Sequence, residues 1–222
     1  MRWFQRRKPL DDETRSQASP GSESPGLVSG LHRSPGMAAL TDELARYPPR
    51  SILDLGTSST ENVSFLSRYC PAISIQDFFQ TTRHARSGSR SAIFRFDETV
   101  VDSLPAADDK FDVVLLWDLL HYFDRRHVPR LIDELGARSR RGALIYLLAS
   151  TLAPIPLTPI RFKIHDRETL DYLVASADRA AAPQLRTRDV ESFLKDYEPE
   201  QLFQLRNGLQ EFLFRFRGGG EG

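Results

Sequence analysis

Short apolar runs separated by helix-like segments recur along the middle of the chain. The sequence predicts strands at 51–55, 72–76, 92–96, 111–117 and 143–148, and helices at 61–69 and 126–139. The run at 111–117 has no polar alternation after Asp112, which is typical of a strand buried on both faces of a parallel sheet. Strand and helix signals that alternate in this way predict βαβ units and a doubly wound, Rossmann-like α/β sheet.

The two flanks of this pattern differ from its middle. A helix is predicted at 37–47, ended by two prolines, and another begins near Thr187 or Asp189. Strands at 200–206 and 209–217 flank an Asn-Gly turn, so they form an antiparallel hairpin at the end of the sheet. Between these parts we expect a proline-rich loop at 153–165 and a helix at 166–176.

Composition sets the domain limits and excludes several classes of function. Residues 1–36 are rich in Ser, Pro, Gly and charge, which predicts a disordered tail before a domain at 37–218. Thirty basic and 30 acidic residues give zero net charge, which argues against nucleic-acid binding by bulk electrostatics. The single cysteine, Cys70, leaves neither a disulfide framework nor zinc-ligand spacing, so no metal is expected. Three prolines interrupt the most apolar window, 142–160, so we expect no membrane span and a cytoplasmic protein.

Candidate binding residues lie where the strands end, because open α/β sheets bind ligands beyond the carboxyl ends of their strands. Asp54 ends the first strand and can either accept a hydrogen bond from a ligand ammonium or fix the loop. Gly56 lets the backbone turn and approach a ligand closely. Thr57 and Ser58 follow, and with the start of the next helix they can bind a carboxylate.

The second and third strands also end at acidic residues. Asp77 stands 23 residues after Asp54, where a carboxylate takes the hydroxyls of a ribose, although it can also be a turn residue. Phe78 follows and could pack on a purine. After the third strand Asp97 could reach an adenine amino group, with Glu98 and Asp102 as alternatives.

The fourth strand ends at Trp117 and Asp118, which face the space where a substrate would lie. His121 and Tyr122 follow shortly afterwards. They are candidates for proton transfer or substrate orientation, and a structural role is the alternative. Arg161, Lys163 and His165 in the proline-rich segment could meet an anionic group.

Several motifs together resemble the class I S-adenosylmethionine-dependent methyltransferases. Ser51-Ile-Leu-Asp-Leu-Gly is similar to their first motif, and Lys110-Phe-Asp-Val-Val-Leu-Leu-Trp-Asp-Leu-Leu-His is similar to their fourth-strand region. Arg140-Arg-Gly-Ala-Leu is similar to the turn into their fifth strand, and the closing hairpin resembles their reversed seventh strand. The resemblance covers residues 40–217 and implies a seven-stranded methyltransferase fold.

The resemblance also implies S-adenosylmethionine as the cofactor and a role for each candidate. Asp54, Gly56 and the loop at 57–59 would hold its methionine part, and Asp77 would bind its ribose beside Phe78. Asp97 or Glu98 would lie near the adenine. Trp117 and Asp118 would close the pocket.

The expected activity is methyl transfer to an unidentified acceptor, more readily a small molecule than a macromolecule. The first motif keeps only Gly56 of the usual two or three glycines, so the alternative is an inactive domain that serves as a protein-binding or regulatory subunit. A nicotinamide-dependent oxidoreductase is disfavoured because Gly-x-Gly-x-x-Gly is missing and Glu61 would repel a pyrophosphate. A hydrolase is disfavoured because the sequence has no Gly-x-Ser-x-Gly elbow.

Overall fold

The computed structural model describes residues 27–83, 94–96, 98–150, 154–175, 177–180 and 185–218. Its α-helices are α1 (Pro35–Arg46), α2 (Thr60–Leu66), α3 (Phe78–Arg83), α4 (Val128–Ala137) and α5 (Thr187–Phe193), and two 3₁₀ helices are η1 (Glu98–Ser103) and η2 (Leu119–Tyr122). Its strands are β1 (Gly30–Arg33), β2 (Ser51–Asp54), β3 (Ala72–Ile75), β4 (Phe111–Trp117), β5 (Ser139–Ser150), β6 (Ile155–Pro156), β7 (Arg161–Asp166), β8 (Thr169–Leu173), β9 (Arg179–Ala180), β10 (Tyr197–Gln204) and β11 (Leu209–Phe216).

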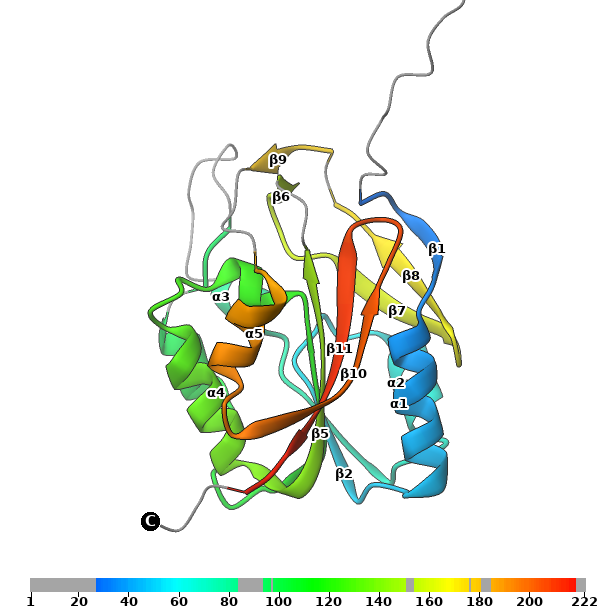
Figure 1. Ribbon diagram of the computed structural model, residues 1–222, viewed down its shortest axis with the longest axis vertical. Helices are drawn as coiled ribbons and strands as arrows, with labels where there is room; N and C mark the ends of the chain where they lie inside the picture. The colour runs from blue at the N-terminus through cyan, green and yellow to red at the C-terminus, as the bar shows by residue number, and fades with distance from the viewer. Residues whose placement is uncertain are drawn as a thin grey trace, which may run out of the picture.

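A six-stranded sheet in the order β10-β11-β5-β4-β2-β3 forms the centre of the molecule (Figure 1). β3, β2, β4 and β5 are parallel to one another, and β11 is antiparallel to both β5 and β10. The predicted parallel sheet with a C-terminal antiparallel hairpin is therefore confirmed. The final strand, β11, inserts between β5 and β10, so the chain closes the sheet with its last element.

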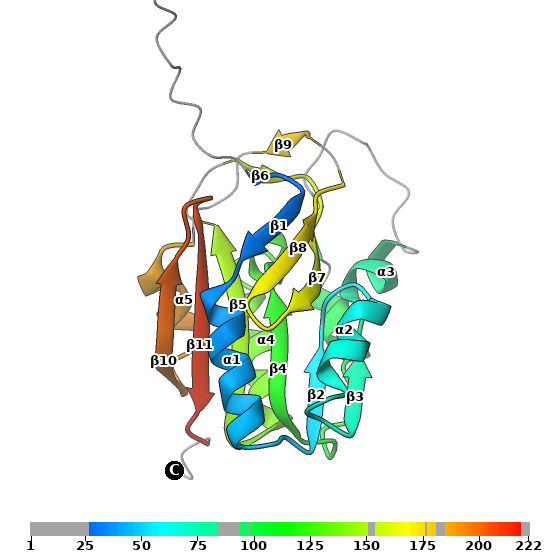
Figure 2. The ribbon, with the colours of Figure 1, turned by 90° about the vertical axis from the view of Figure 1, so that its right-hand side faces the viewer.

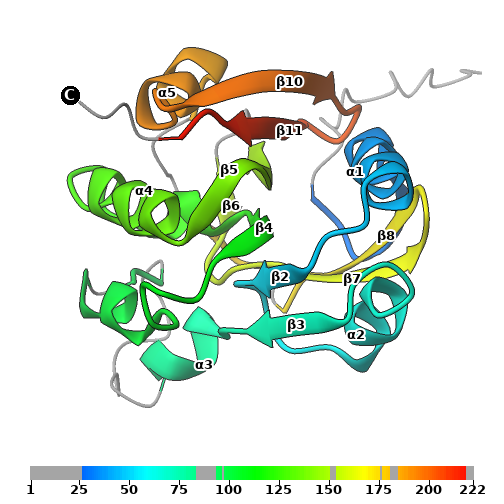
Figure 3. The ribbon, with the colours of Figure 1, turned by 90° about the horizontal axis from the view of Figure 1, so that it is seen from below.

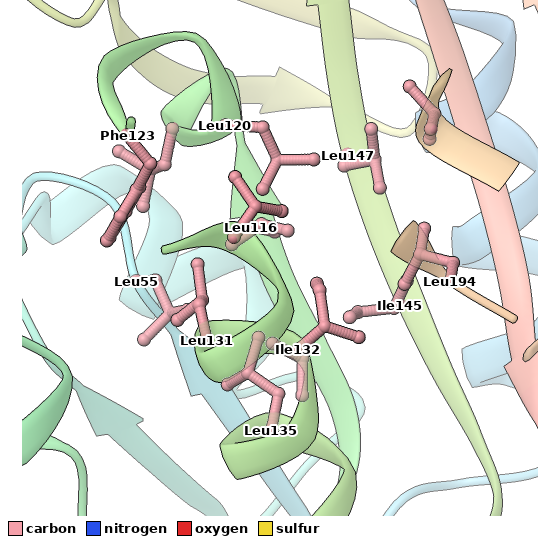
Figure 4. Close-up of a cluster of buried hydrophobic side chains, with 14 of the residues drawn as sticks. Leu55, Leu116, Leu120, Phe123, Leu131, Ile132, Leu135, Ile145, Leu147 and Leu194 are labelled. Atoms are coloured by element: carbon pink, nitrogen blue, oxygen red, sulfur yellow. The ribbon is translucent and has the colours of Figure 1, made fainter. Parts of the chain in front are cut away.

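Helices cover both faces of the main sheet, with α4 on one side and α1 and α2 on the other (Figure 3). Side chains that alternate along the central strands belong to a separate apolar core on each face. On one face, Val114 and Leu116 of β4 and Ile145 of β5 belong to one cluster with residues of α4. The close-up shows Leu116 and Ile145 beside Leu131 and Ile132 of α4 (Figure 4). On the other face, Val113 and Leu115 pack with residues of α1 and α2. Because helices cover both faces of the sheet, the side chains of β4 after Asp112 are apolar on both sides, and its sequence there is a continuous apolar run.

A second sheet, in the order β1-β8-β7, covers the upper part of the α1 and α2 face (Figure 2). The predicted helix at 166–176 is wrong, because this segment contains β8, paired antiparallel with β7. Leu170 and Tyr172 are buried while Asp171 between them is not, which is the two-residue period of a strand. The predicted proline-rich loop likewise contains β6 and β7.

Other expectations differ in detail from the structure. Of the predicted strand at 92–96, residues 94–96 are described, and they form no strand. β1 lies within the segment expected to be a disordered tail and pairs with β8. The helix predicted at 61–69 is α2, at Thr60–Leu66, and Ser59 caps it by accepting a hydrogen bond from the amide of Asn62. None of the helices in the described ranges is long and apolar enough to cross a membrane.

Candidate functional site

Asp54, at the end of β2, is buried, with an exposed fraction of 2%. Its Oδ1 accepts hydrogen bonds from the Gly56 amide at 2.9 Å and from the indole Nε1 of Trp117 at 2.7 Å. Burial raises the pKa of Asp54, and these two hydrogen bonds oppose the rise. Of the two roles expected for this carboxyl, the structure shows the one in which it fixes the loop.

Gly56 touches the indole ring of Trp117. A Cβ built on Gly56 would lie 2.5 Å from both Cδ1 and Nε1 of that ring. The glycine is therefore required, as the sequence indicates, but the group that approaches its backbone is a side chain of the same chain.

Trp117 enters this space through an unusual backbone conformation. Its φ of +51° is the only positive value for a non-glycine residue in the described part of the chain. The indole is 2% exposed and stacks on Phe162 of β7, with ring centroids 5.4 Å apart and planes 7° apart. The ring of Tyr146 meets it edge-on at 5.8 Å. Three aromatic rings thus pack together at the end of β4.

Asn62 of α2 holds β7 in position over these strand ends. Its Nδ2 donates to the carbonyl of Phe162 at 3.1 Å, and its Oδ1 accepts from the amide of Ile164 at 2.7 Å. Asn62 is itself buried, so both bonds are sheltered from water. The second sheet is therefore docked on α2 by a paired side-chain-to-backbone contact.

Asp77 follows β3 and is half-buried. Its Oδ1 accepts from the Gln80 amide at 2.9 Å, which caps α3, and its Oδ2 accepts from the Ser58 amide at 3.2 Å. It therefore joins α3 to the loop after β2. Thr57, in the same loop, is half-buried, and Ser58 is exposed.

Phe78 points away from the strand ends into the core, where it packs on Phe96 and Phe123. The neighbouring Phe79 is half-buried and faces the candidate site instead. Asp97 lies outside the described residues, as does the side chain of Glu98.

Asp118 is buried directly after β4. Its Oδ2 accepts from the amide of Ile160 at 3.1 Å, whereas Oδ1 has no partner among the described residues. Burial raises the pKa of this carboxyl to about 7. Asp118 therefore connects β4 to the segment that enters β7.

His121 and Tyr122 lie in η2 and are also buried. The Nε2 atom of His121 accepts from the Ser150 amide at 2.6 Å, and burial lowers the pKa of the imidazole to about 4, so the ring is neutral. The Tyr122 hydroxyl lies 3.2 Å from the carbonyl oxygen of Pro156 and 2.9 Å from that of Thr158, and the pKa of Tyr122 is well above its ordinary value because of burial. Both side chains bind neighbouring backbone, which matches the structural alternative.

A cavity of about 10 Å³ lies among these groups. That volume holds about one water molecule. Its lining comes from the ends of β2 and β4, from α3 and from the segment before β7: Leu55, Gly56, Thr57, Phe79, Trp117, Asp118, Leu119, Pro159, Ile160 and Phe162. No cluster of three or more His, Cys, Asp or Glu side chains placed to hold a metal occurs in the described ranges.

The strand order identifies the architecture. The parallel strands lie in the order β3-β2-β4-β5, and the antiparallel strand β11 inserts between β5 and β10. This order matches the arrangement implied by the sequence motifs, with six strands in the described sheet where the motifs implied seven. The chain has the class I methyltransferase fold. No family model matches the sequence, and no curated protein matches it either.

Solved structures of methyltransferases are similar to this chain in fold. TehB from Haemophilus influenzae is 14% identical, with 80% of this chain and 61% of TehB covered and a TM-score of 0.48. The N-methyltransferase NodS from Bradyrhizobium japonicum, solved with S-adenosylhomocysteine, is 12% identical over 82% of this chain and 88% of NodS, with a TM-score of 0.46. CalS10, an amino pentose methyltransferase from Micromonospora echinaspora solved with S-adenosylmethionine, is 13% identical over 81% of this chain and 89% of CalS10, with a TM-score of 0.49. The chain thus spans less than two thirds of TehB.

S-adenosylmethionine or its product is bound in two of these neighbours. Within the described ranges, the cavity at this site measures about 10 Å³, whereas ligand pockets measure about 300 Å³ or more, so the described residues do not fit that cofactor in this conformation. The ring of Trp117 fills the space in front of Gly56, and the Asp54 oxygen that would face a ligand ammonium already accepts the indole N–H.

The sequence analysis missed three residues of this site: Asn62, Tyr146 and Phe162. Asn62 reads as an ordinary helix residue and Tyr146 as part of a buried strand. A signal for Phe162 exists in the alternation of Phe162 and Ile164 with polar neighbours, which indicates a strand with one buried face.

Proposed function

We propose that this chain is a catalytically inactive protein of the methyltransferase fold that acts as a binding or regulatory subunit. The observation that carries the proposal is the contact of Trp117 with Gly56 and Asp54, which fills the methionine end of the expected cofactor pocket with the chain's own indole. A ligand there would have to displace a ring that is 2% exposed and take over its hydrogen bond to the buried Asp54, whose other donor is the Gly56 amide. Displacing the buried ring would also expose its apolar surface, which opposes binding.

The docking of the second sheet supports the same proposal. Phe162 stacks on Trp117, and Asn62 binds the Phe162 carbonyl and the Ile164 amide, so removal of the indole would also disturb β7. A filled site with its own hydrogen-bonded support is a structural core rather than a ready pocket.

A second candidate is S-adenosylmethionine-dependent methyl transfer to a small molecule. The half-buried Asp77 at the end of β3, with Phe79 beside the cavity, favours it. In that function Asp77 would bind the ribose hydroxyls, and Trp117 and Phe162 would have to leave the site together.

Calorimetric titration with S-adenosylhomocysteine separates the two candidates. The inactive protein gives no saturable heat at millimolar ligand, while circular dichroism shows that it is folded. Micromolar binding that is lost in Asp77→Ala would contradict the proposal and support the second candidate. Ser74→Ala, on the strand that leads to Asp77, is the matched control and should leave any binding unchanged.

A further inference from the structure

A pocket of about 220 Å³ lies at the edge of the main sheet opposite the candidate site. It is bounded by the end of α1, the turn at 48–50 and the beginnings of β4 and β5, along the lower edge of Figure 1. Arg50, Arg141 and Arg215 line it together with Glu43 and Asp112. None of these residues takes part in the candidate site described above.

Both carboxylates of this pocket are already neutralised. Oδ2 of Asp112 accepts hydrogen bonds from the Arg50 amide at 2.7 Å and from the Arg140 guanidinium at 3.1 Å. Glu43 pairs with Arg46 at 3.6 Å and with Arg215 at 2.8 Å. The acidic groups therefore leave little negative charge for any further cation.

Arg50 and Arg141 carry the remaining positive charge. Both are exposed, and within the described ranges neither guanidinium forms an ion pair with a carboxylate. The neighbouring arginines at 46, 140 and 215 all do. The pocket consequently presents two uncompensated guanidinium groups.

A bulge in β5 brings Arg141 to this edge. Phe111 of β4 pairs with Ser139, but Val113 pairs with Leu144, so β5 contains three more residues than β4 over this interval. Gly142 supports the bulge with a φ of +85°. Bulges of this kind redirect side chains and often lie beside binding sites.

We propose that this pocket binds the phosphate group of a small organic ligand. Guanidinium groups recognise phosphate oxygens through paired, charge-assisted hydrogen bonds. The volume suits a small molecule rather than a large cofactor. Tyr47, which is 67% exposed, and Pro48 offer apolar surface beside the arginines for the organic part.

Titration with phenyl phosphate and with inorganic phosphate tests the proposal at low salt. Phenyl phosphate should bind saturably and more tightly than inorganic phosphate, because its ring can pack beside Tyr47. Arg50→Gln and Arg141→Gln should each raise the dissociation constant about tenfold, as expected for the loss of one charge-assisted hydrogen bond. Tyr47→Ala should remove the preference for phenyl phosphate.

Arg188→Gln is the matched control, because Arg188 is exposed on α5, away from the pocket. It should leave binding unchanged. Absence of saturable binding at millimolar phenyl phosphate would overturn the proposal, as would an equal loss in Arg188→Gln. Thermal unfolding of each variant shows that the fold is retained. The outcome does not depend on whether S-adenosylhomocysteine binds at the opposite edge.

Discussion

The indole Nε1 of Trp117 donates a 2.7 Å hydrogen bond to Oδ1 of Asp54, which joins the end of β4 to the end of β2. These are the strand ends at which open α/β sheets bind ligands. Trp117 adopts a left-handed backbone conformation there, which costs about 1–2 kcal/mol for a non-glycine residue. Stacking on Phe162 and the hydrogen bond to Asp54 offset that cost. Backbone strain of this kind often accompanies a ligand site, but here it accompanies a contact within the chain.

Replacement of Trp117 by Phe tests the contribution of this bond. The aromatic ring remains, but the buried Asp54 loses its indole donor and keeps the Gly56 amide. We expect the free energy of unfolding to fall by about 1–3 kcal/mol in urea denaturation. Asp54→Asn is the control, because its side-chain oxygen can still accept the indole N–H, and it should cost less. Equal stability of Trp117→Phe and the wild type would contradict this account.

Gly56→Ala tests the close approach of the indole to the loop. The added Cβ would lie 2.5 Å from two ring atoms, so Trp117 must move, and overpacking of this kind costs about 1–3 kcal/mol. Gly136→Ala in α4 is the matched control, because its Cβ would lie 3.5 Å from the nearest atom, within ordinary contact distance. Thermal unfolding should show a lower midpoint for the first variant and an unchanged or higher midpoint for the second. The reverse order would refute the packing described here.

Asn62→Ala tests the docking of the second sheet on α2. The change removes two buried hydrogen bonds to the backbone of β7 and should lower the free energy of unfolding by about 2–4 kcal/mol. Hydrogen exchange of the Ile164 amide should accelerate, since that amide loses its acceptor. Glu61→Gln breaks the exposed ion pair with Lys163 between the same two elements and should change neither quantity appreciably. Unchanged exchange at Ile164 in Asn62→Ala would count against the docking role.

Two groups in the segment after β4, Asp118 and His121, should change the stability of the protein with pH in opposite directions. The pKa of Asp118 is about 3.9 in the unfolded chain and is raised to about 7 in the folded protein. Its contribution to the free energy of unfolding is therefore fully present below about pH 3.9 and is lost as the pH rises towards 7. The pKa of His121 is about 6.5 in the unfolded chain and is lowered to about 4 in the folded protein. Its contribution to the free energy of unfolding is therefore present above about pH 6.5 and is lost as the pH falls towards 4. Between these limits the two slopes, about 1.4 kcal/mol per pH unit each, nearly cancel.

Asp118→Asn should expose this compensation. Without Asp118, the free energy of unfolding should rise steeply with pH between 4 and 6.5 relative to the wild type. Urea denaturation across this range provides the measurement. Parallel pH profiles for the two proteins would show that Asp118 does not carry the proton assigned to it.

Most of the central sheet could be predicted from the sequence because its inner parallel strands are apolar runs in a regular order. β4 and the hairpin of β10 and β11 are the plainest cases, since burial on both faces and an Asn-Gly turn are local signals. The second sheet could not, because the prolines at 154, 156 and 159 dominate the segment before β7 and hide the alternation that follows. Without β7, nothing in the sequence brings Phe162 against Trp117.

The position of the candidate site could be predicted from the sequence, but the filling of the site by the Trp117 side chain could not. The sequence indicates that Asp54, Gly56 and Trp117 meet at one edge of the sheet, and the structure brings them together. The donor that binds Asp54 depends on the direction of the Trp117 side chain. That direction follows from the positive φ of Trp117, which no local residue preference indicates.

Fluorescence of Trp117 tests the central claim most directly. The chain has two tryptophans, so Trp3→Phe leaves Trp117 as the single reporter. The account predicts blue-shifted emission that acrylamide quenches poorly and that millimolar S-adenosylhomocysteine does not change, because the indole stays on Gly56. A red shift with increased quenching on addition of S-adenosylhomocysteine would show that the ligand displaces the indole, and it would contradict the claim that this chain closes its own cofactor site.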